Sequence, residues 1–138
     1  MFLNISDVLI NMGGYPLSNH HESYPAAAKL KPYRCGNANR WCGIEGQVLD
    51  MVEHGVDPHY QLQPGISPDG CDSSGVATNG GWTQPALAEY LDFLDDKGVR
   101  HLTVWTSDAF LLPATVSTCP WFMPMLRNWT TTPARGSA

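Results

Sequence analysis

The segment 82–108, WTQPALAEYLDFLDDKGVRHLTVWTSD, constrains the fold of this chain more than any other stretch, because it predicts a complete helix followed by a strand. Thr83 is a suitable N-cap, and Pro85 falls in the first turn, where backbone amides have no intrahelical partner. Gly98 supplies the left-handed conformation in which helices commonly end. The run 99–105 has the apolar character of a buried strand, which favours a parallel sheet covered on both faces.

Four other segments extend this alternation of helix and strand. They are a strand at 7–12, a helix at 44–54, a strand at 58–63 and a closing helix at 120–129. Strands joined through a helix are normally parallel neighbours, because the crossover returns the chain to the same end of the sheet. The sequence therefore predicts an α/β fold of three consecutive βα units with a parallel sheet.

The connections between these elements differ in length. Long loops follow the predicted strands, whereas the chain passes from helix to strand directly after Gly55 and Gly98. This asymmetry is typical of α/β proteins whose functional site lies at the carboxyl ends of the strands. In this pattern the chain resembles the C-terminal portion of a (β/α)-barrel, glycosidase-like protein.

The resemblance implies a partial (β/α) barrel and a sugar ligand or substrate at the carboxyl ends of the strands. It also implies that the remainder of a longer chain, or a partner chain, completes the fold. The range 1–138 is then a single, incomplete domain with a flexible tail at 130–138. A small three-stranded open sheet is the alternative to the barrel.

The composition indicates a soluble globular protein. Hydrophobic residues make up 43% and charged residues 15% of the chain, and the formal net charge is −5. An acidic chain without a Lys/Arg cluster lacks the basic surface on which general nucleic-acid binding rests. No run approaches the roughly 18 apolar residues of a membrane helix. We therefore expect neither a nucleic-acid partner nor a membrane span.

The cysteines and two sequons favour a secretory or extracellular setting. In an oxidising environment Cys35 and Cys42 are predicted to pair, since the loop between them is short and contains Gly36. Asn4-Ile5-Ser6 and Asn128-Trp129-Thr130 are N-glycosylation sequons. The sequence thus predicts a disulfide-bonded glycoprotein.

Asp108 is the candidate catalytic residue, because it follows the strand of the best-defined unit and would face the cleft of a parallel sheet. The alternative is a structural Asx turn or helix cap. Trp105, at the end of the same strand, is a candidate platform for the apolar face of a sugar ring, or else a core residue.

Further substrate-binding candidates carry amides or an indole. Gln61 and Gln63 alternate with apolar residues and are predicted to project from one side of the second strand, where they bind ligand hydroxyls or serve as ordinary polar groups. Asn79 and Trp82 join them at the end of the loop before the central helix.

Metal and cofactor sites are not predicted. The four cysteines form no CxxC pair, and the chain has no GxSxG, Walker A, GxGxxG or HExxH motif. A carbohydrate-active, glycosidase-like protein is therefore the leading functional hypothesis. Its second catalytic carboxylate is not identified. A non-catalytic extracellular carbohydrate- or protein-binding module is the alternative.

Overall fold

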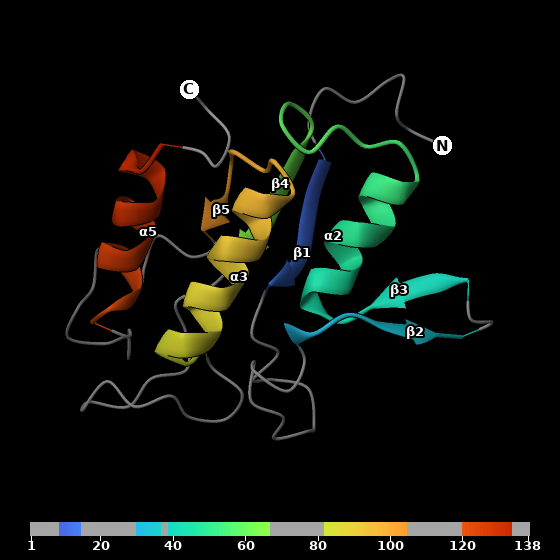
Figure 1. The fold of residues 1–138 in the computed structure, drawn as a ribbon, viewed down its shortest axis with the longest axis horizontal. Helices are drawn as coiled ribbons and strands as arrows, with labels where there is room; N and C mark the ends of the chain where they lie inside the picture. Colours follow the sequence, from blue (N-terminus) through green and yellow to red (C-terminus); the bar gives the residue numbers. More distant parts are fainter. Residues whose placement is uncertain (1–8, 15–29, 37–38, 67–81, 105–119, 134–138) are drawn as a thin grey trace.

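A computed structural model describes residues 9–14, 30–36, 39–66, 82–104 and 120–133 (Figure 1). In chain order the elements are β1 (Leu9–Gly14), β2 (Tyr33–Cys35), β3 (Arg40–Cys42), α2 (Ile44–Glu53), β4 (Leu62–Ile66), α3 (Gln84–Asp96), β5 (Thr103–Val104) and α5 (Phe122–Thr131). The helix α5 thus extends two residues into the range predicted as a flexible tail.

The main sheet consists of parallel strands in the order β1–β4–β5. Leu9 lies opposite Leu62 in the β1–β4 pair, and Gly65 lies opposite Thr103 in the β4–β5 pair. The predicted parallel pairing of these strands is confirmed. Figure 1 shows α3 in front of this sheet, α2 beside β1 and α5 on the side of β5.

The predicted fold class, three consecutive βα units forming part of a (β/α) barrel, is wrong. Along the chain, β2 and β3 come between β1 and α2, and they pair antiparallel to form a second sheet. The first unit is therefore not a simple strand followed by a helix. The barrel prediction rests on the alternation of strand, long loop and helix, and a hairpin within one of those loops leaves this alternation unchanged. Within the described residues, the main sheet matches the alternative of a small open sheet.

Local signals in the sequence account for the helix boundaries. The hydroxyl oxygen of Thr83 accepts a hydrogen bond from the backbone N–H of Ala86 at 3.2 Å, which confirms Thr83 as the N-cap of α3. Gly55 and Gly98 adopt φ values of 92° and 79° after α2 and α3. Glycine alone enters this left-handed region without a steric cost, so both helices end where the sequence predicts.

The hydrophobic core lies between the sheet and the helices. Its members are Leu30, Ile44, Val48, Val56, Leu62, Ile66, Trp82, Ala86, Leu87, Tyr90, Leu91, Leu94, Val99, Phe122 and Leu126. They come from α2, α3, α5, β4 and the segments that precede β2, β4, α3 and β5. Burial of these side chains fixes the position of α5 against the sheet and so shapes the groove described next.

None of the helices described here is long and apolar enough to cross a membrane.

Candidate ligand-binding groove

A groove of about 390 Å³ lies between the β4–β5 edge of the sheet and α5. Its lining combines an amide, a hydroxyl, cationic side chains, apolar side chains and an indole: Gln63, Arg100, His101, Leu102, Val104, Met123, Leu126, Arg127, Trp129 and Thr130. Gln63 is the second residue of β4, and Arg100 to Leu102 directly precede β5. The groove therefore lies at the amino ends of these strands, opposite the end at which the sequence predicted a site.

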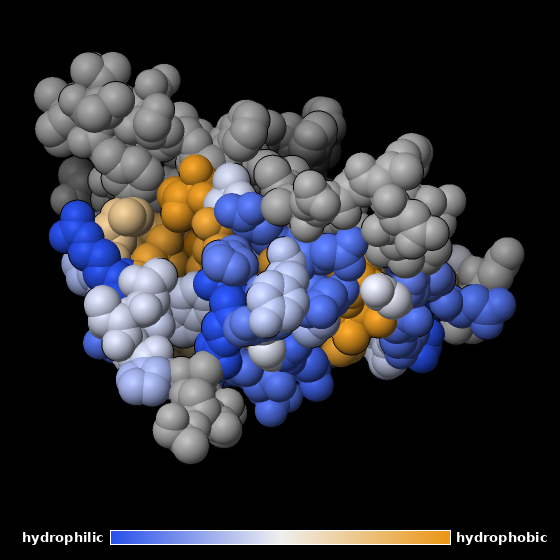
Figure 2. All heavy atoms as spheres, turned by 90° about the horizontal axis from the view of Figure 1, so that it is seen from above, coloured by the Kyte–Doolittle hydropathy of each residue, from blue (hydrophilic) through white to orange (hydrophobic). Residues whose placement is uncertain are grey.

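The helix α5 supplies the outer wall of this groove. Phe122 and Leu126 are buried against the core and anchor the helix, while Arg127 points a charged side chain into solvent. Trp129 follows Leu126 by three residues, on the same side of the helix, and is half-buried. Its indole N–H is buried and has no acceptor among the described residues, so packing holds the ring in place. Figure 2 shows hydrophobic atoms that reach the surface beside strongly hydrophilic ones on one face of the molecule.

The inner wall carries a half-buried ion pair. A guanidinium nitrogen of Arg100 donates to Oδ1 of Asp95 at 2.7 Å, and both side chains are largely shielded from water. The pair ties the end of α3 to the segment that leads into β5. Asp95 does not line this groove, and the described lining contains no carboxylate.

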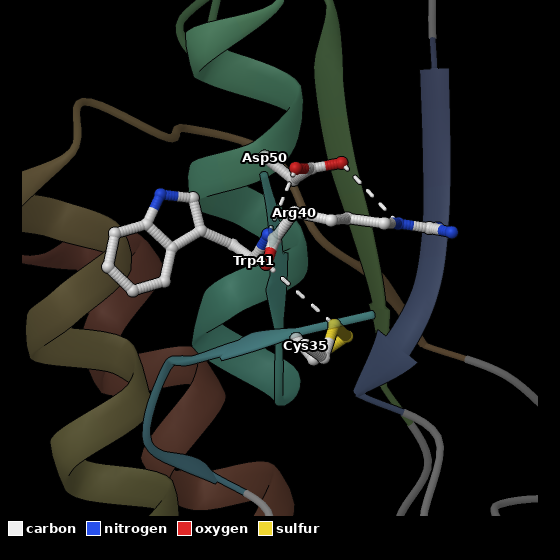
Figure 3. Close-up of a disulfide and its surroundings, with 5 residues drawn as sticks. Cys35, Arg40, Trp41 and Asp50 are labelled. Atoms are coloured by element: carbon white, nitrogen blue, oxygen red, sulfur yellow. Dashed lines mark hydrogen bonds and ion pairs between the residues drawn. A yellow bond between two sulfur atoms is a disulfide. The ribbon is translucent and has the colours of Figure 1, made fainter. Parts of the chain in front are cut away.

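The disulfide hairpin β2–β3 borders a second hollow of about 400 Å³, lined by Cys35, Gly36, Asn39, Arg40, Asp50 and His54. Its charged groups bind one another (Figure 3). Asp50 accepts from the backbone N–H of Trp41 at 3.2 Å, and its other oxygen lies 3.9 Å from Nε of Arg40. A ring nitrogen of His54 hydrogen-bonds the Asp50 carbonyl at 2.6 Å.

The opposite face of the hairpin carries Trp41, whose ring points away from Arg40 in Figure 3. The guanidinium carbon of Arg34 lies 3.7 Å from the centre of the Trp41 ring. The indole N–H of Trp41 donates to Oε1 of Glu53 at 2.7 Å, and Arg34 approaches the same oxygen at 3.9 Å. The contacts with Glu53 hold the hairpin on α2, and the Cys35–Cys42 disulfide links β2 to β3. The predicted disulfide is confirmed.

One buried carboxyl lies outside both hollows. Glu45, in the first turn of α2, is only 4% exposed. Burial raises the pKa of Glu45, and the nearby charges of Lys31 and Lys97 partly offset this effect. Burial, with a contribution from the Glu45 charge, raises the pKa of Tyr90. Tyr90 therefore remains protonated and packs as a core ring between Trp82 and Phe93.

The sequence-predicted site residues occupy different surroundings. Gln63 lines the groove. Gln61 precedes β4, and its side-chain oxygen accepts from the backbone N–H of Asp57 at 3.0 Å, which closes a turn. Trp82 is 0% exposed and stacks on Tyr90 with ring centres 5.4 Å apart. Asp108, Trp105 and Asn79 lie outside the described residues, so their roles stay predictions.

Sequence reasoning missed the cationic side chains of the groove. Arg100 and His101 fall within the run 99–105 that was predicted as a strand, and Arg127 falls within the closing amphipathic helix predicted at 120–129. The available signal was the presence of these cationic side chains within two predicted elements that are otherwise rich in apolar residues.

No protein-family model, no curated protein and no solved structure matches this chain. Within the described part of the chain, no cluster of three or more His, Cys, Asp or Glu side chains is arranged to hold a metal ion.

Proposed function

We propose that this protein binds carbohydrate in the groove between β5 and α5. The observation that carries the proposal is the combination of the Trp129 indole with the Gln63 amide in one groove of about 390 Å³. A sugar ring has an apolar C–H face that packs on an aromatic ring and hydroxyls that hydrogen-bond amides. The volume lies within the range of about 300–1,000 Å³ that is usual for small-molecule sites.

The groove supports binding without hydrolysis. Glycosidic cleavage usually requires two carboxyl groups flanking the bond, and the described lining contributes neither Asp nor Glu. Hydrolysis through Asp108 stays a prediction about another part of the chain. The Cys35–Cys42 disulfide is consistent with an extracellular setting, in which glycans are abundant ligands, so we include that setting in the proposal.

The test is a titration calorimetry screen of short oligosaccharides against the whole protein and three variants. We expect Trp129→Ala to lower the affinity of any sugar that binds by about tenfold or more, because the stacking platform is lost. Gln63→Ala removes one hydrogen-bonding amide and should lower affinity by about fivefold.

Tyr60→Ala is the matched control, since Tyr60 is 73% exposed and does not line the groove. Thermal melts identify any variant that loses affinity through unfolding. If Tyr60→Ala weakens binding as much as Trp129→Ala does, the sugar site is elsewhere. If no oligosaccharide binds the parent protein, the proposal is wrong.

A further inference from the structure

Among the described lysines and arginines, Arg127 differs from the others because it forms no ion pair. The described lysines and arginines other than Arg127 each have a carboxylate partner: Lys31 with Glu89, Arg34 with Glu53, Arg40 with Asp50, Lys97 with Asp96 and Arg100 with Asp95. Arg127 is exposed and makes no ion pair within the described ranges. Among the described cations of this acidic chain, Arg127 is therefore the one without a carboxylate partner.

This arginine is exposed to solvent and at the same time lines the groove. It shares the lining with Trp129, Gln63 and the exposed His101. Arg100, the other arginine of the lining, is bound by Asp95 at 2.7 Å and is therefore largely neutralised. The charge available to a ligand is thus that of Arg127, a planar guanidinium that can donate two parallel hydrogen bonds to an oxyanion.

We propose that the groove prefers a sugar carrying a negative group, either the carboxylate of a uronic acid or a sulfate ester, and that Arg127 binds that group. This inference rests on the proposed carbohydrate function. In this proposal the sugar ring packs on Trp129, a sugar hydroxyl hydrogen-bonds Gln63, and the negative group of the sugar binds Arg127. The remaining acidic surface opposes an anionic ligand only over short distances, since the Debye length is about 8 Å at physiological ionic strength. The local guanidinium therefore decides the selectivity.

The experiment compares matched pairs of probes by titration calorimetry. The first pair is an oligogalacturonate and its methyl ester, which has the same rings without the charge. The second pair is a sulfated galactan oligosaccharide and its desulfated form. We expect the charged member of at least one pair to bind about tenfold more tightly than its neutral partner, and the advantage to shrink as salt is raised. The pair in which the charged sugar binds more tightly shows whether the groove prefers a carboxylate or a sulfate ester.

Arg127→Gln should reduce the affinity for the charged sugar to that for the neutral one, and leave the neutral sugar unchanged. Arg127→Lys should retain part of the advantage, because a lysine keeps the charge but not the forked geometry. Arg40→Gln is the control: it removes the same charge from a side chain that is 76% exposed on the hairpin, next to α2 rather than α5. This variant should keep the full advantage.

The outcomes separate the two proposals. If charged and neutral sugars bind equally well, or if Arg127→Gln keeps the preference for charge, the assignment of Arg127 is wrong while carbohydrate binding stands. If neither member of either pair binds and the oligosaccharide screen is also negative, the proposed function itself is wrong.

Discussion

The hairpin hollow and the β5–α5 groove have nearly the same volume, about 400 and 390 Å³, but they differ in how they use charge. Around the hairpin, Arg40 and Asp50 bind each other, and Arg34 lies against both Trp41 and Glu53. In the groove, Arg127 has no ion-pair partner among the described residues. Cavity size therefore does not distinguish a structural hollow from a candidate site in this protein, whereas an uncommitted charge does.

The largest effect that this comparison predicts concerns the disulfide. Replacing both cysteines, Cys35→Ser with Cys42→Ser, should lower the free energy of unfolding by about 2–3 kcal/mol, because a covalent link across a sequence separation of 7 no longer restricts the unfolded chain. Urea unfolding of parent and variant measures the difference. Sugar binding to the folded variant should be unchanged. A loss of binding without unfolding would show that the hairpin and the groove are coupled.

A smaller effect separates two exposed arginines. Arg34→Gln should lower the free energy of unfolding by about 0.5–1.5 kcal/mol, since it removes a cation–π contact with Trp41 and an ion pair with Glu53. Arg127→Gln should change stability by no more than about 0.5 kcal/mol, because its charge has no ion-pair partner to lose among the described residues. Urea melts at matched pH and salt compare the two. Equal destabilisation by both substitutions would remove the distinction drawn above.

The smallest effect is a pH dependence that begins in α2. The folded protein holds the Glu45 proton more tightly than the unfolded chain, because burial raises its pKa above the ordinary value of 4.5, with Lys31 and Lys97 offsetting part of the shift. The stabilisation that comes from this tighter proton binding is fully present below about pH 4.5, and it is lost as the pH rises through the folded-state pKa of Glu45. Glu45→Gln should remove this pH-dependent loss of stability. The free energy of unfolding of the variant should therefore rise relative to that of the parent as the pH rises.

Urea unfolding at a series of pH values tests this prediction. The difference between variant and parent should grow above the ordinary carboxyl pKa and then level off. A difference that stays constant with pH would mean that Glu45 ionises as freely in the folded protein as in the unfolded chain.

Local signals predicted much of the backbone. Thr83, Gly55 and Gly98 act at helix ends as the sequence indicates, because capping and left-handed turns depend on the few residues that form them. The Cys35–Cys42 bond was predictable for the same reason, since a short loop keeps the two thiols close.

The start of β4 and the positions of the two glutamines could not be predicted from such local signals. The second strand was placed at 58–63, but it begins at Leu62, because a side-chain oxygen of Asp57 accepts from the amides of His59 and Tyr60 and folds the intervening residues into a turn. That shift leaves Gln61 outside the strand and Gln63 within it. The two amides were predicted to act together, yet only Gln63 lines the groove.

The site illustrates the same limit. The sequence around Trp82 is compatible both with a sugar-binding platform and with a core residue. The packing of α3 on the sheet decides between them, because it buries Trp82 against Tyr90. Gln63, Arg100 and Arg127 belong to three segments far apart in the chain. Only the docking of α5 beside β5 brings them to one groove.

The sequence by itself determined where α3 begins, where α2 and α3 end, that Cys35 pairs with Cys42 and that β1, β4 and β5 run parallel, since each of these follows from neighbouring residues or from a single helical crossover. The tertiary structure alone decided that a hairpin forms a second sheet and that the groove opens at the amino ends of the strands. It also decided which cations have a carboxylate partner. Ion pairing and burial depend on distances between segments, and those distances are set by the packing of the core.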